Sequence, residues 1–244
     1  MNKITFRMDD VGASTKLYNI YSKKFFGNFF FLKKMSQFKA WGPYNEIEPN
    51  KWEEIFDYIG ENNFKLTLAI TASWVDEKSN LIPFYDKFPK QAKIISENLK
   101  HKFLEITNHG LTHCVVGKHL PRLMSSSRKY HREFWDWLPY DLHYSNLDQS
   151  STIFKNWLGY SPRILVPPGN VYSLKTINAC EKLNFDMINS STVIHNNSKI
   201  RIYNNDNVFA FHDRDIVLNG VEWLKQKYNE RSFGYEFKFL KEIK

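Results

Sequence analysis

Apolar and polar positions form short alternating runs that are separated by longer segments with helical spacing. Ile4 to Met8 alternate and then stop at Asp9-Asp10, which predicts a strand that delivers carboxylates to its C-terminal end. Leu66 to Ile70 predict a second strand, and 103–106 predict a third that ends at Asn108-His109. Further strands are predicted at 163–166, 185–188 and 208–211.

Helical segments lie between these strands. Apolar residues recur at helical spacing in 52–59, and Asn50 with Glu53 predicts a capping box at the start of that helix. A second helix is predicted at 91–99, a third opens at Asn146 with Gln149 and stops at Gly159, and Ser173 caps a fourth. This alternation predicts an α/β fold, with a parallel sheet or barrel, helices outside, and functional groups at the C-terminal ends of the strands.

Length and composition limit the protein class. A chain of 244 residues, 42% of them hydrophobic, can bury a substantial core, and we expect one domain over 1–244. No run approaches the ~20 apolar residues of a membrane span, and polar residues come too early for a secretory signal, so we expect a cytoplasmic protein. Cys114 and Cys180 are too few for a disulfide framework and are expected to be buried apolar residues.

The formal charge of +8 is spread along the chain without a nucleic-acid-binding signature. It suits an anionic substrate or an acidic membrane surface better. Residues 23–34 hold five phenylalanines between two pairs of lysines, a composition that would suit peripheral contact with a membrane interface. The favoured interpretation is that these aromatic side chains pack over the barrel.

Three segments carry candidate chemistry. His109 and His113 are four residues apart, so on one helical turn both imidazoles would point the same way and share one metal ion. The spacing is weak evidence alone, but Asp9-Asp10 can complete a His₂Asp set while one carboxylate stays unliganded. Adjacent residues of an extended strand face opposite ways, so both serve one site only at an irregular strand end. His212 follows an apolar strand and could donate a proton to a leaving group.

Together these segments resemble the polysaccharide deacetylase family, also called the NodB homology or carbohydrate esterase 4 family. Residues 6–10, Phe-Arg-Met-Asp-Asp, resemble its Thr-Phe-Asp-Asp motif, and residues 105–113 resemble its Glu-Ile-Gly-Asn-His run that ends in His-x-x-x-His. Residues 165–170 are similar to its Arg-x-Pro-Tyr-Gly motif, and 211–213 to its hydrophobic-x-His strand end. Motif order and spacing agree across residues 4–215.

The resemblance implies a distorted (β/α) barrel and a set of residue roles. Asp10, His109 and His113 would bind a divalent metal ion, for which zinc is expected. Asp9 would be the general base and His212 the general acid. A backbone N–H near Gly169 or Asn170, in the turn that includes Pro168, would help to stabilise the oxyanion.

Two positions depart from the family pattern. Its third-motif arginine, which usually tunes the base, aligns with Val166, and Arg7 or Arg214 are the candidates to replace it. Its fourth-motif aspartate, which usually orients the catalytic histidine, aligns with Ser190-Ser191, and Asp213 or Asp215 are the candidates there.

The expected activity is metal-dependent hydrolysis of the N-acyl group, acetyl or formyl, of an amino sugar. Without export the chain would not reach cell-wall polymers, so the expected substrate is a nucleotide-linked or lipid-linked sugar in surface-polysaccharide biosynthesis. The alternative is a non-catalytic carbohydrate-binding protein on a degenerate deacetylase scaffold, which the two departures motivate. Retention of Asp9 and His212 argues against that alternative.

Overall fold

The computed structural model describes residues 2–18, 46–120, 128–194 and 197–243. The predicted membrane contact of residues 23–34 lies outside these residues and stays a prediction. Within the described ranges, no helix combines the length and the apolar character that a membrane span requires.

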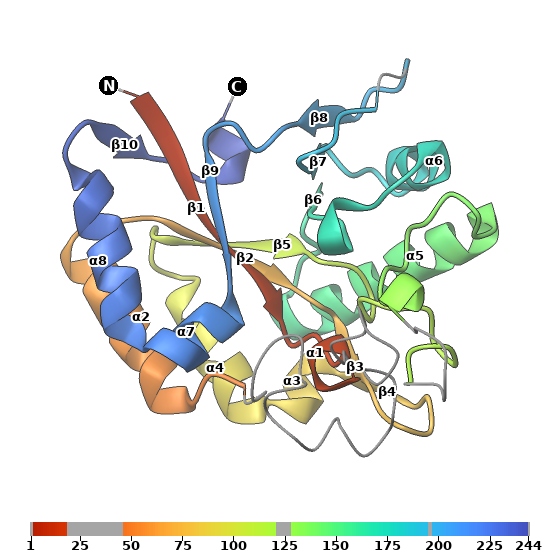
Figure 1. Ribbon diagram of the computed structural model, residues 1–244, viewed down its shortest axis with the longest axis horizontal. Helices are drawn as coiled ribbons and strands as arrows, with labels where there is room; N and C mark the ends of the chain where they lie inside the picture. Colours follow the sequence, from red (N-terminus) through yellow and green to blue (C-terminus); the bar gives the residue numbers. More distant parts are fainter. Residues whose placement is uncertain (1, 19–45, 121–127, 195–196, 244) are drawn as a thin grey trace, which may run out of the picture.

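A parallel eight-stranded sheet forms the centre of the fold and curls into a distorted (β/α) barrel (Figure 1). Its order is β10-β1-β2-β5-β6-β7-β8, and β9 pairs with β1 as well. The strands are β1 (Asn2–Val11), β2 (Leu66–Ile70), β5 (Leu104–Asn108), β6 (Ile164–Leu165), β7 (Met187–Asn189), β8 (Arg201–Tyr203), β9 (Val208–His212) and β10 (Tyr235–Phe237). A separate antiparallel pair consists of β3 (Ser73–Val75) and β4 (Leu81–Pro83).

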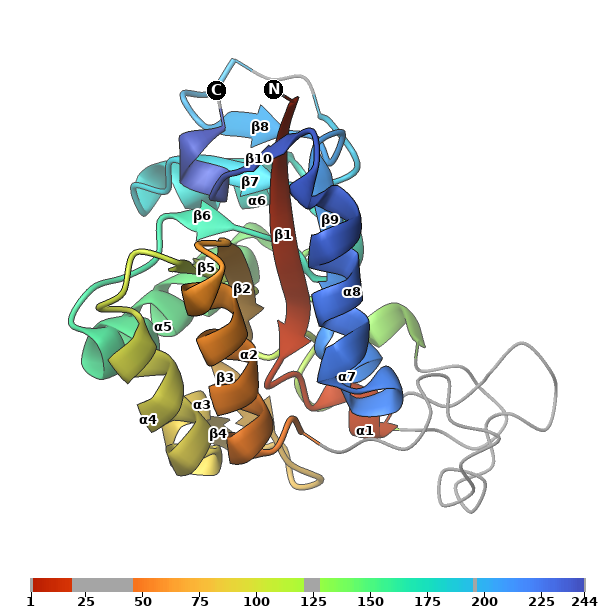
Figure 2. The same cartoon turned by 90° about the vertical axis from the view of Figure 1, so that its left-hand side faces the viewer.

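The helices divide into two groups around this sheet. The α-helices are α1 (Thr15–Tyr18), α2 (Pro49–Glu61), α3 (Phe84–Lys87), α4 (Pro89–Asn98), α5 (Tyr140–Leu158), α6 (Leu174–Lys182), α7 (Asp213–Asn219) and α8 (Val221–Ser232), with short 3₁₀ turns at Arg128–Tyr130, Pro168–Asn170 and Leu240–Glu242. Figure 2 shows α2, α4 and α8 on one outer face. The main hydrophobic core lies between them and β1, β2 and β5, whereas α5 and α6 enclose a second core with β6 and β7.

Strand β1 is buried on both faces, which explains its composition. Ile4, Phe6 and Met8 alternate into the main core, where burial of each large side chain contributes ~1.5–3 kcal/mol. The intervening Arg7 and Asp9 are also buried, at 1% and 8% exposure. Because side chains of a strand alternate with period two, these polar residues share the opposite face, inside the barrel.

Most predicted strands are confirmed within one or two residues, and the strand Leu66–Ile70 is confirmed at both ends. Gly159 closes α5 in the left-handed conformation (φ 80°), and the capping box of Ser173 with Thr176 opens α6. Both cysteines are buried, as predicted.

Two predicted helix starts are wrong. Helix α2 begins at Pro49, after Glu48, so Asn50 lies inside its first turn and forms no cap. Helix α5 begins at Tyr140, and Asn146 is one of its interior residues. The Asn146 side chain points into the protein and donates a hydrogen bond to Glu133 at 3.0 Å, so its polarity serves a tertiary contact and not a helix end.

Candidate metal and catalytic site

Asp10, His109 and His113 come together at the C-terminal ends of β1 and β5. Asp10 Oδ1 lies 3.0 Å from Nε2 of each imidazole, and the three ligand atoms all lie within 4.8 Å of one another. Ligands around a tetrahedral divalent ion, each ~2.0–2.2 Å from it, lie roughly 3.4 Å apart. The donor set and its spacing therefore fit a divalent metal ion with open coordination positions.

Hydrogen bonds at the far side of each ring aim both Nε2 atoms at this point. His109 Nδ1 lies 2.6 Å from the carbonyl oxygen of Val166, and His113 Nδ1 lies 3.1 Å from Thr15 Oγ1. Partners of this kind fix the tautomer and orientation of ligating histidines. The His109 contact also ties the candidate metal-binding cluster to the loop after β6.

Electrostatics hold these groups in the forms that bind metal. Burial works against ionisation of Asp10, but its contacts with His113 and His109 outweigh burial and keep its pKa well below the usual range. Burial lowers the pKa of His113 to about 4, against the opposing effect of Asp10. An ionised carboxylate beside a neutral imidazole is the pair that a divalent ion requires.

The end of β1 is irregular, as the prediction that both aspartates serve one site required. Asp10 has φ 66°, and the register of β1 against β2 shifts between Met8 and Val11. The left-handed region is uncommon for a residue other than glycine, and aspartate is among the residues that enter it most often. The bend turns Asp10 toward the histidines while Asp9 keeps its position in the strand.

The predicted helical turn at 109–113 is wrong. The segment from His109 to His113 contains no helix, and His113 itself has φ 63°. The loop folds around the buried carboxylate of Glu133, which accepts the backbone N–H of His113 at 3.0 Å and that of Leu111 at 3.2 Å. A Cβ at Gly110 would lie 1.8 Å from Glu133 Oε1, so this close approach requires glycine.

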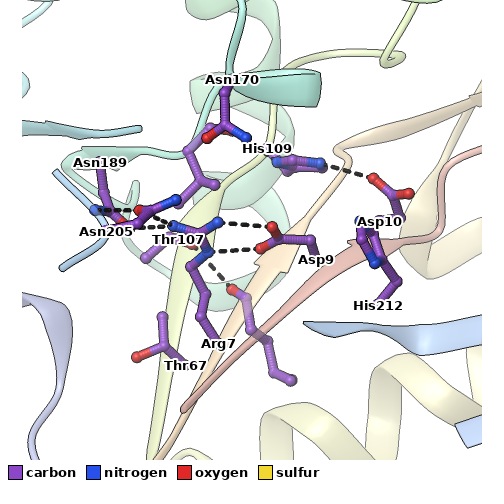
Figure 3. A network of polar contacts seen from close by, with 12 residues as sticks. Arg7, Asp9, Asp10, Thr67, Thr107, His109, Asn170, Asn189, Asn205 and His212 are labelled. Atoms are coloured by element: carbon purple, nitrogen blue, oxygen red, sulfur yellow. Dashed lines mark hydrogen bonds and ion pairs between the residues drawn. The ribbon is translucent and has the colours of Figure 1, made fainter. Parts of the chain in front are cut away.

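Arg7 holds Asp9 in a buried bidentate contact (Figure 3). Its Nε and Nη2 each donate to one carboxylate oxygen at 2.7 Å, and its Nη1 donates to Asn189 and, at 3.2 Å, to Asn205. Paired N–H···O bonds of this kind fix both distance and orientation. Of the two candidates for the missing third-motif arginine, Arg7 makes the contact with Asp9.

His212 stands next to Asp9 because β1 and β9 pair in parallel with these two residues in register. Its Nδ1 lies 3.7 Å from Asp215 Oδ2, and its backbone N–H donates to the same oxygen at 2.9 Å. Burial lowers the pKa of His212, but the Asp215, Asp10 and Asp9 carboxylates together raise it above its usual value. Of the two candidates Asp213 and Asp215, Asp215 is the one that contacts His212.

Lys16 contacts both the end of β1, which carries Asp10, and the start of α7, which follows His212. Its side chain is buried, donates to the backbone carbonyl of Asp10 at 2.5 Å and forms an ion pair with Asp213. Although burial lowers the pKa of Lys16, the Asp213 charge raises it above the usual value. This buried pair therefore ties the end of β1 to the start of α7.

These residues surround a pocket of about 50 Å³. Its lining comprises Asp9, Asp10, His109, His113, Arg132, Pro167, Gly169, Asn170 and His212. All the predicted site residues are in this lining except Pro168, which is buried. Two lining residues were not predicted. Pro167 precedes the predicted turn directly, whereas Arg132 belongs to no motif and lies in the irregular segment before α5.

The family model for polysaccharide deacetylase matches residues 39–188. The chain belongs to the polysaccharide deacetylase family. The matched segment contains His109 and His113, whereas Asp9, Asp10 and His212 lie outside it and reach the site through β1 and β9. No curated protein sequence matches the chain.

Solved structures of carbohydrate esterase family 4 share this polysaccharide deacetylase fold. A family 4 acetyl xylan esterase from Clostridium thermocellum, in complex with cobalt, is 14% identical over 99% of this chain and 89% of its own, with a TM-score of 0.51. A family 4 pseudoenzyme from Bacillus anthracis is 12% identical, with a TM-score of 0.53, and the match covers 99% of this chain and 65% of the pseudoenzyme. A mutant of this pseudoenzyme with restored enzymatic activity is 11% identical, with a TM-score of 0.54, and the match covers 99% of this chain and 67% of the mutant.

Proposed function

We propose that this polysaccharide deacetylase removes an N-acyl group, acetyl or formyl, from an amino sugar, with zinc held by Asp10, His109 and His113. The observation that carries the proposal is the in-register pairing of Asp9 with His212 on neighbouring strands beside this cluster. A base and an acid on either side of one metal site are what amide hydrolysis needs, and carbohydrate binding alone needs neither.

The division of work follows from the contacts. A divalent ion in this site would supply activation of water and polarisation of the acyl carbonyl. Asp9, oriented by Arg7, accepts the proton of the attacking water. His212 protonates the amine nitrogen as the C–N bond breaks, and Asp215 keeps its imidazole in place for that step. The products are a free amino sugar and a short carboxylic acid.

The size and charge of the site support a small acyl group on an anionic carrier. The pocket of about 50 Å³ holds only a few atoms, which suits formyl or acetyl. The formal charge of +8 favours a substrate that carries phosphate, such as a nucleotide-linked or lipid-linked sugar in surface-polysaccharide biosynthesis. The protein would then act in the cytoplasm, at or near the membrane.

The alternative of a non-catalytic carbohydrate-binding protein rested on two missing family residues. Arg7 contacts Asp9, and Asp215 contacts His212. These contacts support the proposal that Arg7 tunes the base and that Asp215 orients the catalytic histidine in place of the missing family residues. The departures from the family motifs therefore no longer favour loss of activity.

The deciding test compares Asp9→Asn with Asp10→Asn. Acetate and formate release is measured with nucleotide-linked and lipid-linked N-acyl amino sugars, next to metal content and circular dichroism. Asp10→Asn should lose metal and activity together, because a neutral amide is a poorer ligand than a carboxylate. Asp9→Asn should keep the metal and lose ~10²-fold or more in rate, because its base is gone.

Each other outcome has a definite meaning. If Asp9→Asn sheds the metal and Asp10→Asn keeps it, the two roles are exchanged. Full activity and metal content in both variants would reject the deacetylase mechanism, and a wild type that binds these sugars without releasing acid would favour the carbohydrate-binding alternative.

A further inference from the structure

Arg132 lines the same pocket as the metal cluster, the base and the acid. It comes from the irregular segment between the 3₁₀ turn Arg128–Tyr130 and α5, far in sequence from the other lining residues. A permanent positive charge therefore faces the space in which the acyl group would react.

The backbone on either side of Arg132 is anchored to the site. His131 is 1% exposed, and its Nε2 lies 2.7 Å from the carbonyl oxygen of His119. Glu133 is fully buried and holds the loop that carries His113. Arg132 is thus fixed between two buried residues, and one of them is bonded directly to the segment that carries a metal ligand.

The guanidinium group is also fixed in direction. Its Nη1 donates to the carbonyl oxygen of His131 at 2.6 Å, and its Nε packs against Gly169. A Cβ at position 169 would lie 1.7 Å from that Nε, and Gly169 has φ 59°. Glycine at this position therefore allows the Arg132 side chain to approach the turn that follows β6 closely.

That same turn has few backbone donors to offer a substrate. Pro167 and Pro168 have no N–H, the N–H of Asn170 donates to Pro167 at 2.9 Å, and that of Val171 donates to Pro168 at 3.3 Å. The Asn170 N–H was one of the two predicted oxyanion donors, and this bond commits it elsewhere. The Gly169 N–H, the Asn170 side-chain amide and the arginine packed against Gly169 are donors that this wall supplies among the described residues.

We propose that Arg132 contacts the acyl carbonyl oxygen and stabilises the oxyanion that forms there. The inference rests on the proposed hydrolysis. When water attacks, the electron pair of the C=O bond moves onto oxygen, and Arg132 donates to that oxygen. When the tetrahedral species collapses, the pair returns, the C–N bond breaks, and nitrogen takes the proton of His212. One amide and one water give one amine and one carboxylic acid.

The expected size of the effect is large. Loss of one oxyanion donor costs ~10²–10³-fold in kcat in other hydrolases, because such donors act in a site with little water. Arginine suits this task, since it stays charged at every working pH and its donors form a rigid plane. Because the contact strengthens only as charge develops on oxygen, its removal should lower kcat far more than it raises KM.

The test uses the metal-loaded full chain with Arg132→Gln, Arg132→Lys and the matched control Arg163→Gln. Arg163 is an exposed arginine that pairs with Asp186 and does not line the pocket. Acid release is measured with N-acetylglucosamine, which is uncharged, and with a phosphate-bearing N-acyl sugar. Binding of a tetrahedral phosphonamidate analogue of the acetamido group is measured by calorimetry, and metal content and circular dichroism are recorded for each variant.

We expect Arg132→Gln to lose ~10²-fold or more in kcat on both sugars and to weaken analogue binding by a similar factor, with metal content unchanged. Arg132→Lys should recover part of the loss, and Arg163→Gln should match the wild type. Equal behaviour of Arg132→Gln and Arg163→Gln would overturn the inference. An effect confined to a higher KM for the phosphate-bearing sugar would also overturn it, because Arg132 would then contact the phosphate-bearing carrier. A loss of activity that matches a loss of bound metal would overturn it as well.

Failure of the proposed function gives a different result. A wild type that releases no acid but binds the analogue in an Arg132-dependent manner would reject hydrolysis and retain the contact of Arg132 with a tetrahedral anion. A wild type that neither releases acid nor binds the analogue would reject both.

Discussion

The two flanks of the Asp10–His109–His113 cluster differ in how tightly they hold their proton-transfer residue. On one flank, Asp9 is 11% exposed in its side chain and is held by Arg7 through two contacts of 2.7 Å. On the other flank, His212 is 33% exposed and reaches Asp215 only over 3.7 Å. The Asp9 side, called the base flank here, is held rigidly inside the barrel. The His212 side, called the acid flank, is partly exposed to solvent.

This difference matches the sizes of the groups that each flank would serve. In the proposed reaction a water molecule attacks from the side of Asp9, where a rigid carboxylate at a fixed distance would be sufficient. The leaving amine would belong to a sugar that is too large for a pocket of about 50 Å³, so the proposed acid would have to stand where the sugar can reach it. We therefore expect mutations on the base flank to affect folding and activity together, and mutations on the acid flank to affect activity alone.

The largest expected effect is on the acid flank. His212→Ala should lose ~10²–10⁴-fold in turnover, the usual contribution of a general acid, and keep its metal and melting temperature. The loss should shrink for activated esters, whose leaving groups need no proton. Turnover with amides and esters, metal content and thermal melting check this, and equal losses on both substrates would assign His212 a structural role.

An intermediate effect is expected on the base flank, where Arg7→Met should affect stability as well as rate. It leaves Asp9 buried without its guanidinium, and breaking a buried pair in this way costs ~3–5 kcal/mol. Denaturant unfolding measures the free energy, and acid release measures the rate. Lys51→Met, which removes an exposed pair with Glu54, is the control and should change neither quantity appreciably. An Arg7→Met protein as stable as the wild type would remove the contrast between the flanks.

The smallest expected effect is a shift in pH dependence with Asp215→Asn. Burial lowers the pKa of His212 and the carboxylates around it raise it, so removing the Asp215 charge should lower that pKa. The acid form would then be lost at lower pH, and the alkaline limb of kcat/KM should move down by ~1 unit. A pH profile of each protein checks this, and an unmoved alkaline limb would mean that a group other than His212 titrates there.

Local sequence predicted much of the framework and of the metal site. The strand Leu66–Ile70 and the caps at Gly159 and Ser173 followed from residues next to one another in the chain. Arg7 also had a local signal, because residues two apart on a strand share a face and Arg7 precedes Asp9 by two. The sequence alone left Arg7 and Arg214 as alternatives, and the contact between Arg7 and Asp9 inside the barrel distinguishes them.

The tertiary structure decided the features that depend on contacts across the chain. The loop from His109 to His113 is not helical because the carboxylate of Glu133, 20 residues after His113, takes its backbone N–H groups. Arg132 lines the pocket and packs against Gly169, which is distant from it along the chain. Periodicity and capping patterns depend only on residues that are close along the chain. The sequence by itself therefore indicated which groups could bind metal and transfer protons. Which other charges surround those groups depends on tertiary packing.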